Sequence, residues 1–330
     1  MTKSVVTGGA GFIGSHLVEH LLAAGDEVVV LDDLSTGTFD NLRDSAGHPA
    51  FRFVQGSVLD QETVGTSMDG ADRVFHLAAA VGVKLIVDHA LDSLCTNIRG
   101  TETVLETALR ARAKMLLVST SEVYGKNTAD KLDEDSDRIY GSPLKARWSY
   151  AAAKAIDESL AYGYWRERGL RITMVRLFNT VGPRQTGRYG MVVPTLVGQA
   201  LRGDDLTVYG DGEQTRCFTS VTDVVPALVR IVEHPAAYGK VFNLGGETEI
   251  SIGDLARRIV RVLGSDSAIV HVPYGQAYGE GFEDMRRRVP DNSRARELIG
   301  FRPRTGLDDI IRQVAAASPA MTPETLRAAR

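Results

Sequence analysis

Residues 5–14 read Val-Val-Thr-Gly-Gly-Ala-Gly-Phe-Ile-Gly, a short apolar strand that runs directly into a glycine-rich turn. Gly8 permits the tight reversal, Gly11 lets the backbone approach a pyrophosphate, and Gly14 allows the next helix, roughly residues 12–24, to pack closely on the sheet. Free N–H groups at the start of that helix favour a bound anion. The stretch therefore predicts a dinucleotide-binding turn, with contacts from Gly8, Gly11, Phe12, Ile13 and Gly14.

A second strand supports this interpretation. Residues 27–32 read Glu-Val-Val-Val-Leu-Asp, so a carboxylate ends the strand about twenty residues after the turn, where an acid binds the adenosine ribose of a dinucleotide. We expect Asp32 to make that contact. Since no arginine follows immediately, NAD is favoured over NADP as the cofactor. The neighbouring positions expected to line this part of the site are Asp33, Ser35, Thr36 and Gly37.

Composition excludes several other classes of function. The chain has 330 residues and a net charge of −4, which gives no basic footprint for nucleic acid. The two cysteines, Cys95 and Cys217, lie far apart, and no His/Cys spacing is typical of a metal site. No apolar run is long enough to span a membrane, and the first strand leaves no room for a leader. We expect a cytoplasmic protein without a metal.

Strand-like runs alternate with segments of helical periodicity through the first half. Such alternation indicates parallel strands with helices on both faces, a Rossmann-type, doubly wound α/β sheet. After residue 178 the rhythm changes, which predicts a smaller α/β substrate lobe. We therefore expect an NAD-binding domain over 1–178 and a lobe mainly over 179–330, some segments of which return to the first domain. The expected strands are 4–7, 27–31, 51–54, 73–76, 115–119 and 172–176.

The pair Tyr150 and Lys154 carries the chemistry. A spacing of four on a helix puts both side chains on one face, so the ammonium can stabilise a phenolate and lower the pKa of the tyrosine. Such a tyrosine is a general base for a sugar hydroxyl while a hydride leaves to a nicotinamide. The Ser119-Thr120-Ser121 strand end precedes this helix and supplies hydroxyl groups.

At this point the chain resembles the extended short-chain dehydrogenase/reductases that act on nucleotide sugars. The resemblance covers nearly the whole chain and includes the turn at 7–14, Leu-Asp-Asp-Leu-Ser-Thr-Gly at 31–37, His-Leu-Ala-Ala at 76–79, Asn-x-x-Gly-Thr at 97–101 and Arg-Leu-Phe-Asn at 176–179. It implies that Tyr150 is the base, that Lys154 holds the nicotinamide ribose and that Thr120 hydrogen-bonds near the O4 of the sugar. It also implies cofactor contacts from Leu77, Ala78, Ala79, Lys84, Asn97, Ser119 and, near the adenine, Ser57 and Val58.

One departure occurs at Ser57, where relatives usually carry an aspartate that binds the adenine amine. A serine hydroxyl can make a weaker contact at the same place.

The second half resembles the part of this family that grips a nucleotide diphosphate. Arginine suits this role because its planar fork binds phosphate oxygens in two-pronged fashion. We expect Lys84 to contribute to the substrate site as well as to the cofactor site, and Arg184 and Arg188 to bind a carboxylate at C6 of the sugar. The positions that match the uracil and diphosphate contacts are Asn179, Val193, Leu206, Val208, Tyr209, Arg216 and Arg288.

The reaction depends on the residues after Thr120. Dehydratases of this family usually place an Asp-Glu pair there, whereas this chain has Ser121-Glu122, which UDP-glucuronate decarboxylases also carry. The stretch after residue 79 looks more like that of 4-epimerases. Our main expectation is an NAD-dependent UDP-sugar 4-epimerase that converts UDP-glucuronate to UDP-galacturonate through a 4-keto intermediate. The first alternative is UDP-glucuronate decarboxylase, followed by UDP-glucose 4-epimerase and 4,6-dehydratase.

Two expectations concern partners. A regulator that binds NAD or a UDP-sugar without turnover is an alternative of another class, although such proteins usually lose the tyrosine or the lysine. The helices expected at 93–111 and 149–168 resemble the pair that joins two subunits in relatives, which implies a homodimer.

Overall fold

In the computed structural model, the described residues are 1–80, 90–187, 190–278 and 285–318. Within them, seven parallel strands form one sheet in the order β11-β6-β5-β4-β1-β2-β3. The strand order reverses between β4 and β1. In open α/β sheets, ligands bind outside the carboxyl ends of the strands at such a switch point. The strands are β1 Lys3–Thr7, β2 Glu27–Asp32, β3 Phe51–Gln55, β4 Arg73–His76, β5 Lys114–Thr120, β6 Ile172–Leu177 and β11 Val241–Leu244.

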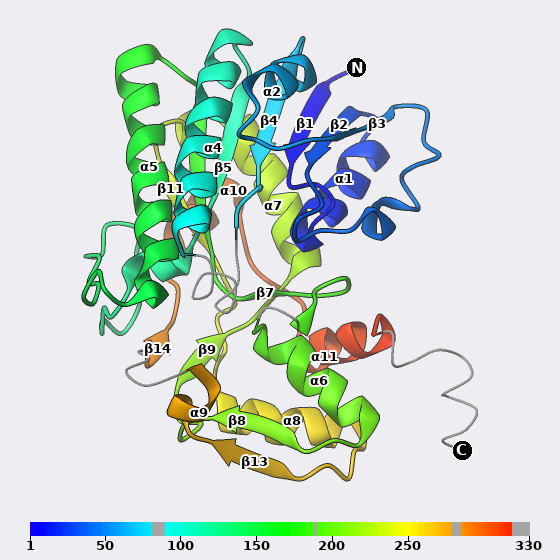
Figure 1. Ribbon diagram of the computed structural model, residues 1–330, viewed down its shortest axis with the longest axis vertical. Helices are drawn as coiled ribbons and strands as arrows, with labels where there is room; N and C mark the ends of the chain where they lie inside the picture. The colour runs from blue at the N-terminus through cyan, green and yellow to red at the C-terminus, as the bar shows by residue number, and fades with distance from the viewer. Residues whose placement is uncertain (81–89, 188–189, 279–284, 319–330) are drawn as a thin grey trace.

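Alternate residues of these strands point to opposite faces of the sheet, and each face has its own apolar core. Helices cover both faces of the sheet (Figure 1). One core joins Val6, Val30 and Val175 to the helices α1, α7 and α10. The other core joins Val5 and Val29 to α2, α4 and α5. The helices are α1 Phe12–Ala23, α2 Gln61–Met68, α4 Ala90–Arg110, α5 Ser149–Arg168, α7 Val221–Glu233 and α10 Ser293–Ile299.

The prediction of a doubly wound α/β sheet is confirmed, and the expected strands agree with the observed ones to within two residues. Three segments of the second half lie in the first. Strand β11 pairs with β6 along Val241–Leu244, α7 packs on α1, and α10 packs on α7 and β11.

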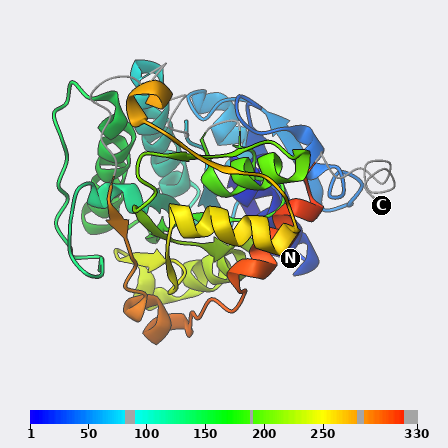
Figure 2. The ribbon, with the colours of Figure 1, turned by 90° about the horizontal axis from the view of Figure 1, so that it is seen from below.

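A smaller core occupies the rest of the second half. It is formed by α6 Val192–Arg202, α8 Ile252–Leu263 and α11 Leu307–Ala316, and Figure 2 shows α8 (yellow) beside α11 (red). Two short sheets lie next to it in the order β12-β9-β14 and β13-β8, and β7 pairs with β10. The remaining elements are β7 Thr180–Val181, β8 Leu206–Tyr209, β9 Thr215–Cys217, β10 Thr219–Ser220, β12 Glu249–Ser251, β13 Ile269–Val272, α9 Tyr274–Tyr278 and β14 Arg287–Arg288.

The glycine turn is closed by contacts that leave no space for side chains. Gly8 has φ +74°, and a Cβ atom there would lie 2.6 Å from the backbone nitrogen of Ala78. A Cβ atom on Gly14 would collide with the carbonyl oxygen of Gly8. Because this neighbour is backbone, it cannot swing away, and the helix would have to move off the sheet.

We therefore predict that Gly14→Ala lowers the free energy of unfolding by about 2 kcal/mol, as expected for overpacking. Gly65→Ala in α2 is the matched control, since no atom lies within 4 Å of the added Cβ atom. Removal of a helical glycine there should stabilise the protein by about 0.5–1 kcal/mol. Urea titrations of both variants measure the difference, and equal effects would contradict the steric argument.

Candidate functional site

The turn and the start of α1 form a cradle for a dinucleotide. Gly11 is the N-cap of α1, and no side chain caps the free N–H groups of the first turn. A Cβ atom on Gly11 would meet only the carbonyl oxygen of Gly8, at 3.2 Å, so the backbone here is open to a close approach. Phe12 and Ile13 are partly exposed beside it. These features fit a pyrophosphate group.

Two hydrogen bonds fix the side chain of Asp32 at the end of β2. Its two carboxylate oxygens accept backbone N–H groups from Ala10, at 2.9 Å, and Leu34, at 2.8 Å. Burial raises the pKa of Asp32, and these two hydrogen bonds oppose that effect. Each oxygen keeps a lone pair, so the carboxylate fits a ribose hydroxyl. Around it, Asp33 and Ser35 are exposed, Thr36 is partly exposed, and Gly37 packs on Ala10.

The ends of β3 and β4 supply the rest of this edge. Leu77, Ala78 and Ala79 are partly exposed and can border a ligand. Asn97 of α4 does not face outward, because its side chain exchanges two hydrogen bonds with the backbone of Ala80. It shapes the loop that follows β4. At β3, the hydroxyl of Ser57 accepts the N–H group of Leu59 at 3.2 Å, and Val58 is buried.

Tyr150 and Lys154 lie on α5, as predicted, but the expected effect of the lysine on the tyrosine is not found. Burial raises the pKa of Tyr150, and the negative charges of Glu122 and Asp157 raise it further. The ammonium of Lys154 instead pairs with Asp157, with Nζ 3.1 Å from Oδ2. The expectation of a lowered tyrosine pKa is not met in this structure because burial disfavours the phenolate and the charges of Glu122 and Asp157 add to that effect.

The Thr120-Ser121-Glu122 corner is built around an ionised carboxylate. Thr120 ends β5, and its hydroxyl accepts the N–H group of Glu122 at 3.2 Å. Arg147 donates to both carboxylate oxygens of Glu122, at 2.6 and 3.3 Å. Burial raises the pKa of Glu122, but the charges of Arg147 and then Arg288 outweigh it and lower the value to about 2. Glu122 is thus an anion, not a proton donor, at neutral pH.

Sequence reasoning missed Arg147. It sits in a short 3-10 helix, Ala146–Trp148, directly before α5, and only 6% of its side chain is exposed. The signal was an arginine three residues before Tyr150, just ahead of the helix that begins at Ser149.

Arg288 and Arg216 join this corner from the second half. They lie opposite each other in the pairing of β14 with β9, and both are buried. Arg288 approaches Ser121 Oγ at 3.4 Å and Glu122 at 3.5 Å, and it donates to Asn179 Oδ1 at 3.0 Å. Three predicted residues, Asn179, Arg216 and Arg288, are therefore gathered beside the Ser121-Glu122 pair.

Other predicted substrate contacts are contradicted by burial. Leu206, Val208 and Val193 are at most 1% exposed and belong to the core of the second half. Because side chains alternate along a strand, Leu206 and Val208 share the inner face of β8, whereas Tyr209 on the other face is partly exposed. On that other face, Thr207 of β8 is also partly exposed.

The loop after β7 contacts α1. Arg184 pairs with Glu19 of α1, and His16 of the same helix bonds the carbonyl of Pro183 at 3.0 Å. Arg184 is thus linked to α1 through its Nη2 atom, and its predicted contact with a sugar carboxylate stays a prediction. Lys84 and Arg188, two other predicted contacts, lie outside the described residues.

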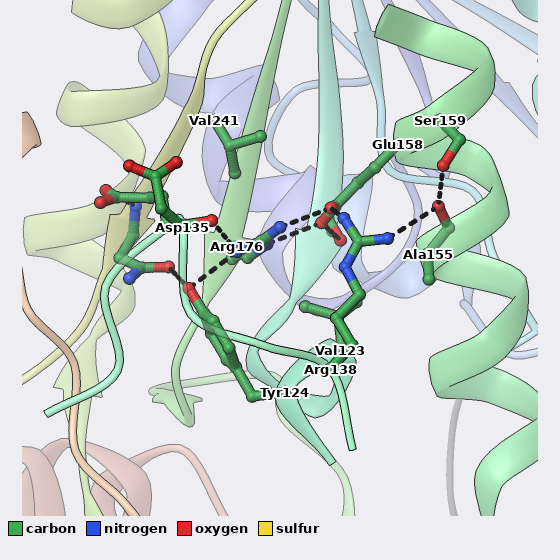
Figure 3. A network of polar contacts seen from close by, with 12 residues as sticks. Val123, Tyr124, Asp135, Arg138, Ala155, Glu158, Ser159, Arg176 and Val241 are labelled. Carbon is green, nitrogen blue, oxygen red and sulfur yellow. Dashed lines mark hydrogen bonds and ion pairs between the residues drawn. The ribbon is translucent and has the colours of Figure 1, made fainter. Parts of the chain in front are cut away.

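A buried polar network holds α5, the helix that carries Tyr150 and Lys154, in place (Figure 3). Glu158, one turn after Lys154, accepts Ser119 Oγ at 2.6 Å, Arg138 at 2.6 Å and Arg176 at 2.7 and 2.9 Å. Arg176 also donates to Tyr124, whose hydroxyl donates to Asn243 of β11. Ser119 was expected to bind the cofactor, and the structure shows its hydroxyl holding Glu158 instead.

Two further kinds of feature, a membrane-spanning helix and a metal-binding cluster, are not found among the described residues. Over the described ranges, no helix is long and apolar enough to cross a membrane. No cluster of three His, Cys, Asp or Glu side chains suited to a metal ion occurs in the same part of the chain.

The sheet, the glycine turn, Asp32 and the Tyr150/Lys154 helix together define a nucleotide-dependent enzyme of the short-chain dehydrogenase/reductase class. The sequence model of the family described as GDP-mannose 4,6 dehydratase matches residues 5–314, so the chain belongs to that family. The family is enzymatic and NAD-dependent.

Two similar relatives are decarboxylases. The chain is 42% identical over 302 residues to UDP-N-acetyl-alpha-D-glucosaminuronate decarboxylase of Bacillus cytotoxicus, covering 91% of this chain and 92% of that protein. It is 35% identical over 309 residues to UDP-glucuronic acid decarboxylase 1 of Xenopus tropicalis, covering 93% and 70% respectively.

Solved structures of similar fold include epimerases. UDP-glucose 4-epimerase of Thermotoga maritima, bound to UDP-glucose, gives a TM-score of 0.86 at 30% identity and covers 99% of both chains. UDP-glucuronic acid 4-epimerase of Bacillus cereus, bound to UDP-glucuronic acid and NAD, also gives 0.86, at 28% identity, with 96% of this chain and 98% of that one covered.

The network around Glu158 gives a stability prediction. Arg176→Met leaves a buried carboxylate without its main partner, and we expect a loss of about 3 kcal/mol in the free energy of unfolding. Arg43→Met, which breaks an exposed ion pair with Asp40, should cost less than about 0.5 kcal/mol. Thermal unfolding of both variants tests this, and similar losses would show that the buried pair is not important for stability.

Proposed function

We propose that this protein is an NAD-dependent UDP-uronate decarboxylase that oxidises C4 of the sugar, releases carbon dioxide and re-reduces the ketone. One observation carries the proposal. Ser121 replaces the acid that a dehydratase needs, and Arg147 and Arg288 keep Glu122 ionised, so this corner has no carboxylic acid to protonate a leaving hydroxyl. The similarity to the two decarboxylases supports the same conclusion.

The first step needs a base at the O4 hydroxyl. Tyr150 takes that proton, and Thr120 at the end of β5 orients the hydroxyl. NAD supplies the chemistry of hydride acceptance from C4 and, later, of hydride return. Residues of the glycine turn would hold its pyrophosphate, and Asp32 would hold its adenosine ribose. Its positive nicotinamide also favours the Tyr150 phenolate, whose formation burial opposes.

The second step follows from the chemistry of a β-keto acid. With a ketone at C4 and a carboxylate on C5, the C5–C6 bond breaks and its electron pair moves into the ketone to form an enolate, as carbon dioxide leaves. C5 then takes a proton from water, and return of the hydride to C4, with the proton held by Tyr150 passing back to O4, would give a UDP-pentose. The guanidinium of Arg288, which lies beside Ser121 and Glu122, is our first candidate to hold the C6 carboxylate, and Arg184, which pairs with Glu19, remains a second candidate.

The comparisons favour this decarboxylase, our alternative, over the 4-epimerase that was our main expectation. The fold alone does not separate the two, because a UDP-glucuronic acid 4-epimerase superposes well on this chain. A non-catalytic regulator is disfavoured because Thr120, Tyr150 and Lys154 are all present.

We predict that the purified protein with NAD converts UDP-glucuronate, or its 2-acetamido analogue, to a UDP-pentose with loss of carbon dioxide. Mass-resolved chromatography and proton NMR identify the product. Tyr150→Phe should lower turnover by about 100-fold or more while NAD binding persists. An isobaric product with a galacto-type H4 signal would instead establish the epimerase.

We also propose a homodimer formed through α4 and α5, which lie side by side at one edge of the molecule (Figure 1). Large apolar side chains are exposed on these helices, at Leu91, Ile156, Tyr162 and Trp165. An interface between two copies would cover them.

Light scattering after gel filtration should therefore give twice the mass of one chain. Ile156→Asp should shift the protein towards the monomer. Val270→Asp, at an equally exposed apolar residue of β13, should leave the mass unchanged. A monomeric wild-type protein would contradict the proposed interface.

A further inference from the structure

The ion pair between Lys154 and Asp157 has no part in the reaction described above. Both side chains are almost completely buried, with 2% of Lys154 and none of Asp157 exposed. A buried carboxylate costs several kcal/mol of solvation unless a charge compensates it. Burial raises the pKa of Asp157, and the charge of Lys154 opposes that rise. The pair is therefore coupled: each group fixes the charge and the place of the other.

Other charged groups around Tyr150 are already engaged elsewhere. Glu122 is held by Arg147 and Arg288. His76 of β4 bonds Thr7 and Thr101 through its two ring nitrogens, at 2.7 and 3.1 Å. Burial, and then the charge of Lys154, lower the pKa of His76 to about 3, so its ring is neutral. Glu158 is bound by Arg138, Ser119 and Arg176.

We propose that Asp157 is a positioning residue that acts through Lys154: it compensates the ammonium charge and so sets the pH range in which Tyr150 can serve as the base. The proposal rests on the function proposed above for Tyr150. Lys154 lies one helical turn from Tyr150, and Asp157 lies three residues further along the same buried face. Without Asp157, the full charge of Lys154 would act on the tyrosine and favour the phenolate.

The test is Asp157→Asn, which removes the charge and keeps the shape. The acid limb of kcat/KM against pH reports ionisation of the base in the free enzyme. Because a negative charge near Tyr150 opposes that ionisation, its loss should move this limb to lower pH. We expect a shift of about half a pH unit or more, which raises the rate on the limb about threefold.

A second readout needs no substrate. With NAD bound, the ultraviolet absorbance of tyrosinate should show one tyrosine that ionises at lower pH in Asp157→Asn than in the wild type, and this signal should vanish when Tyr150→Phe is added. The control is Asp266→Asn, an exposed aspartate in the second half, which should change neither profile. Product identity tests the decarboxylase, whereas the ionisation of Tyr150 tests Asp157 with any UDP-sugar or with none.

Asp157→Ser, which also removes the charge and leaves space for water, is the second variant. An unchanged profile in either folded variant, or a shift to higher pH, would overturn the proposal. Loss of the cooperative thermal transition in both variants would also overturn it, because Asp157 would then serve stability alone.

Discussion

The geometry of the active site depends on the buried contact between Glu158 and Arg176. Glu158 lies on the helix that carries Tyr150 and Lys154, whereas Arg176 lies on β6 opposite Ser119 of β5. An isolated carboxylate in this position would be strongly destabilising, but here four hydrogen bonds from three donor residues satisfy it. This contact links α5, which carries Tyr150 and Lys154, to β5 and β6. Because Thr120 ends β5, the contact fixes the position of Thr120 relative to Tyr150.

The charged groups near Tyr150 form two separate arrangements. In one, arginines from both halves hold Glu122 as an anion, and this favours chemistry in which no group has to be protonated before it leaves. In the other, a lysine and an aspartate neutralise each other below Tyr150. Burial and the negative charges of Glu122 and Asp157 raise the pKa of this tyrosine, so its phenolate would need a compensating positive charge.

Local sequence patterns predicted the fold well, and they placed Tyr150 and Lys154 on one helix. The glycine turn, Asp32 and the Tyr150/Lys154 pair are each set by short-range geometry, which a sequence displays directly. Contacts between distant segments were missed: Arg184 pairs with Glu19, and Arg147 with Glu122, and neither pairing has a local signature. Leu206 and Val208 were misassigned because the inward face of β8 is decided by packing on α6 and α8, not by family position.

The return of β11 and α7 to the first half has a consequence for how the chain folds. Residues up to 178 form six of the seven strands in the described sheet. The edge of β6 is paired with β11, and α1 is packed against α7, and both of these segments come after residue 220. The apolar stripe of α7, with Val224, Leu228 and Ile231, is wholly buried there. Contacts of such long sequence separation form slowly, and an uncovered strand edge invites aggregation. During synthesis, we therefore expect the seven-stranded sheet to be completed only after α7 and β11 have left the ribosome.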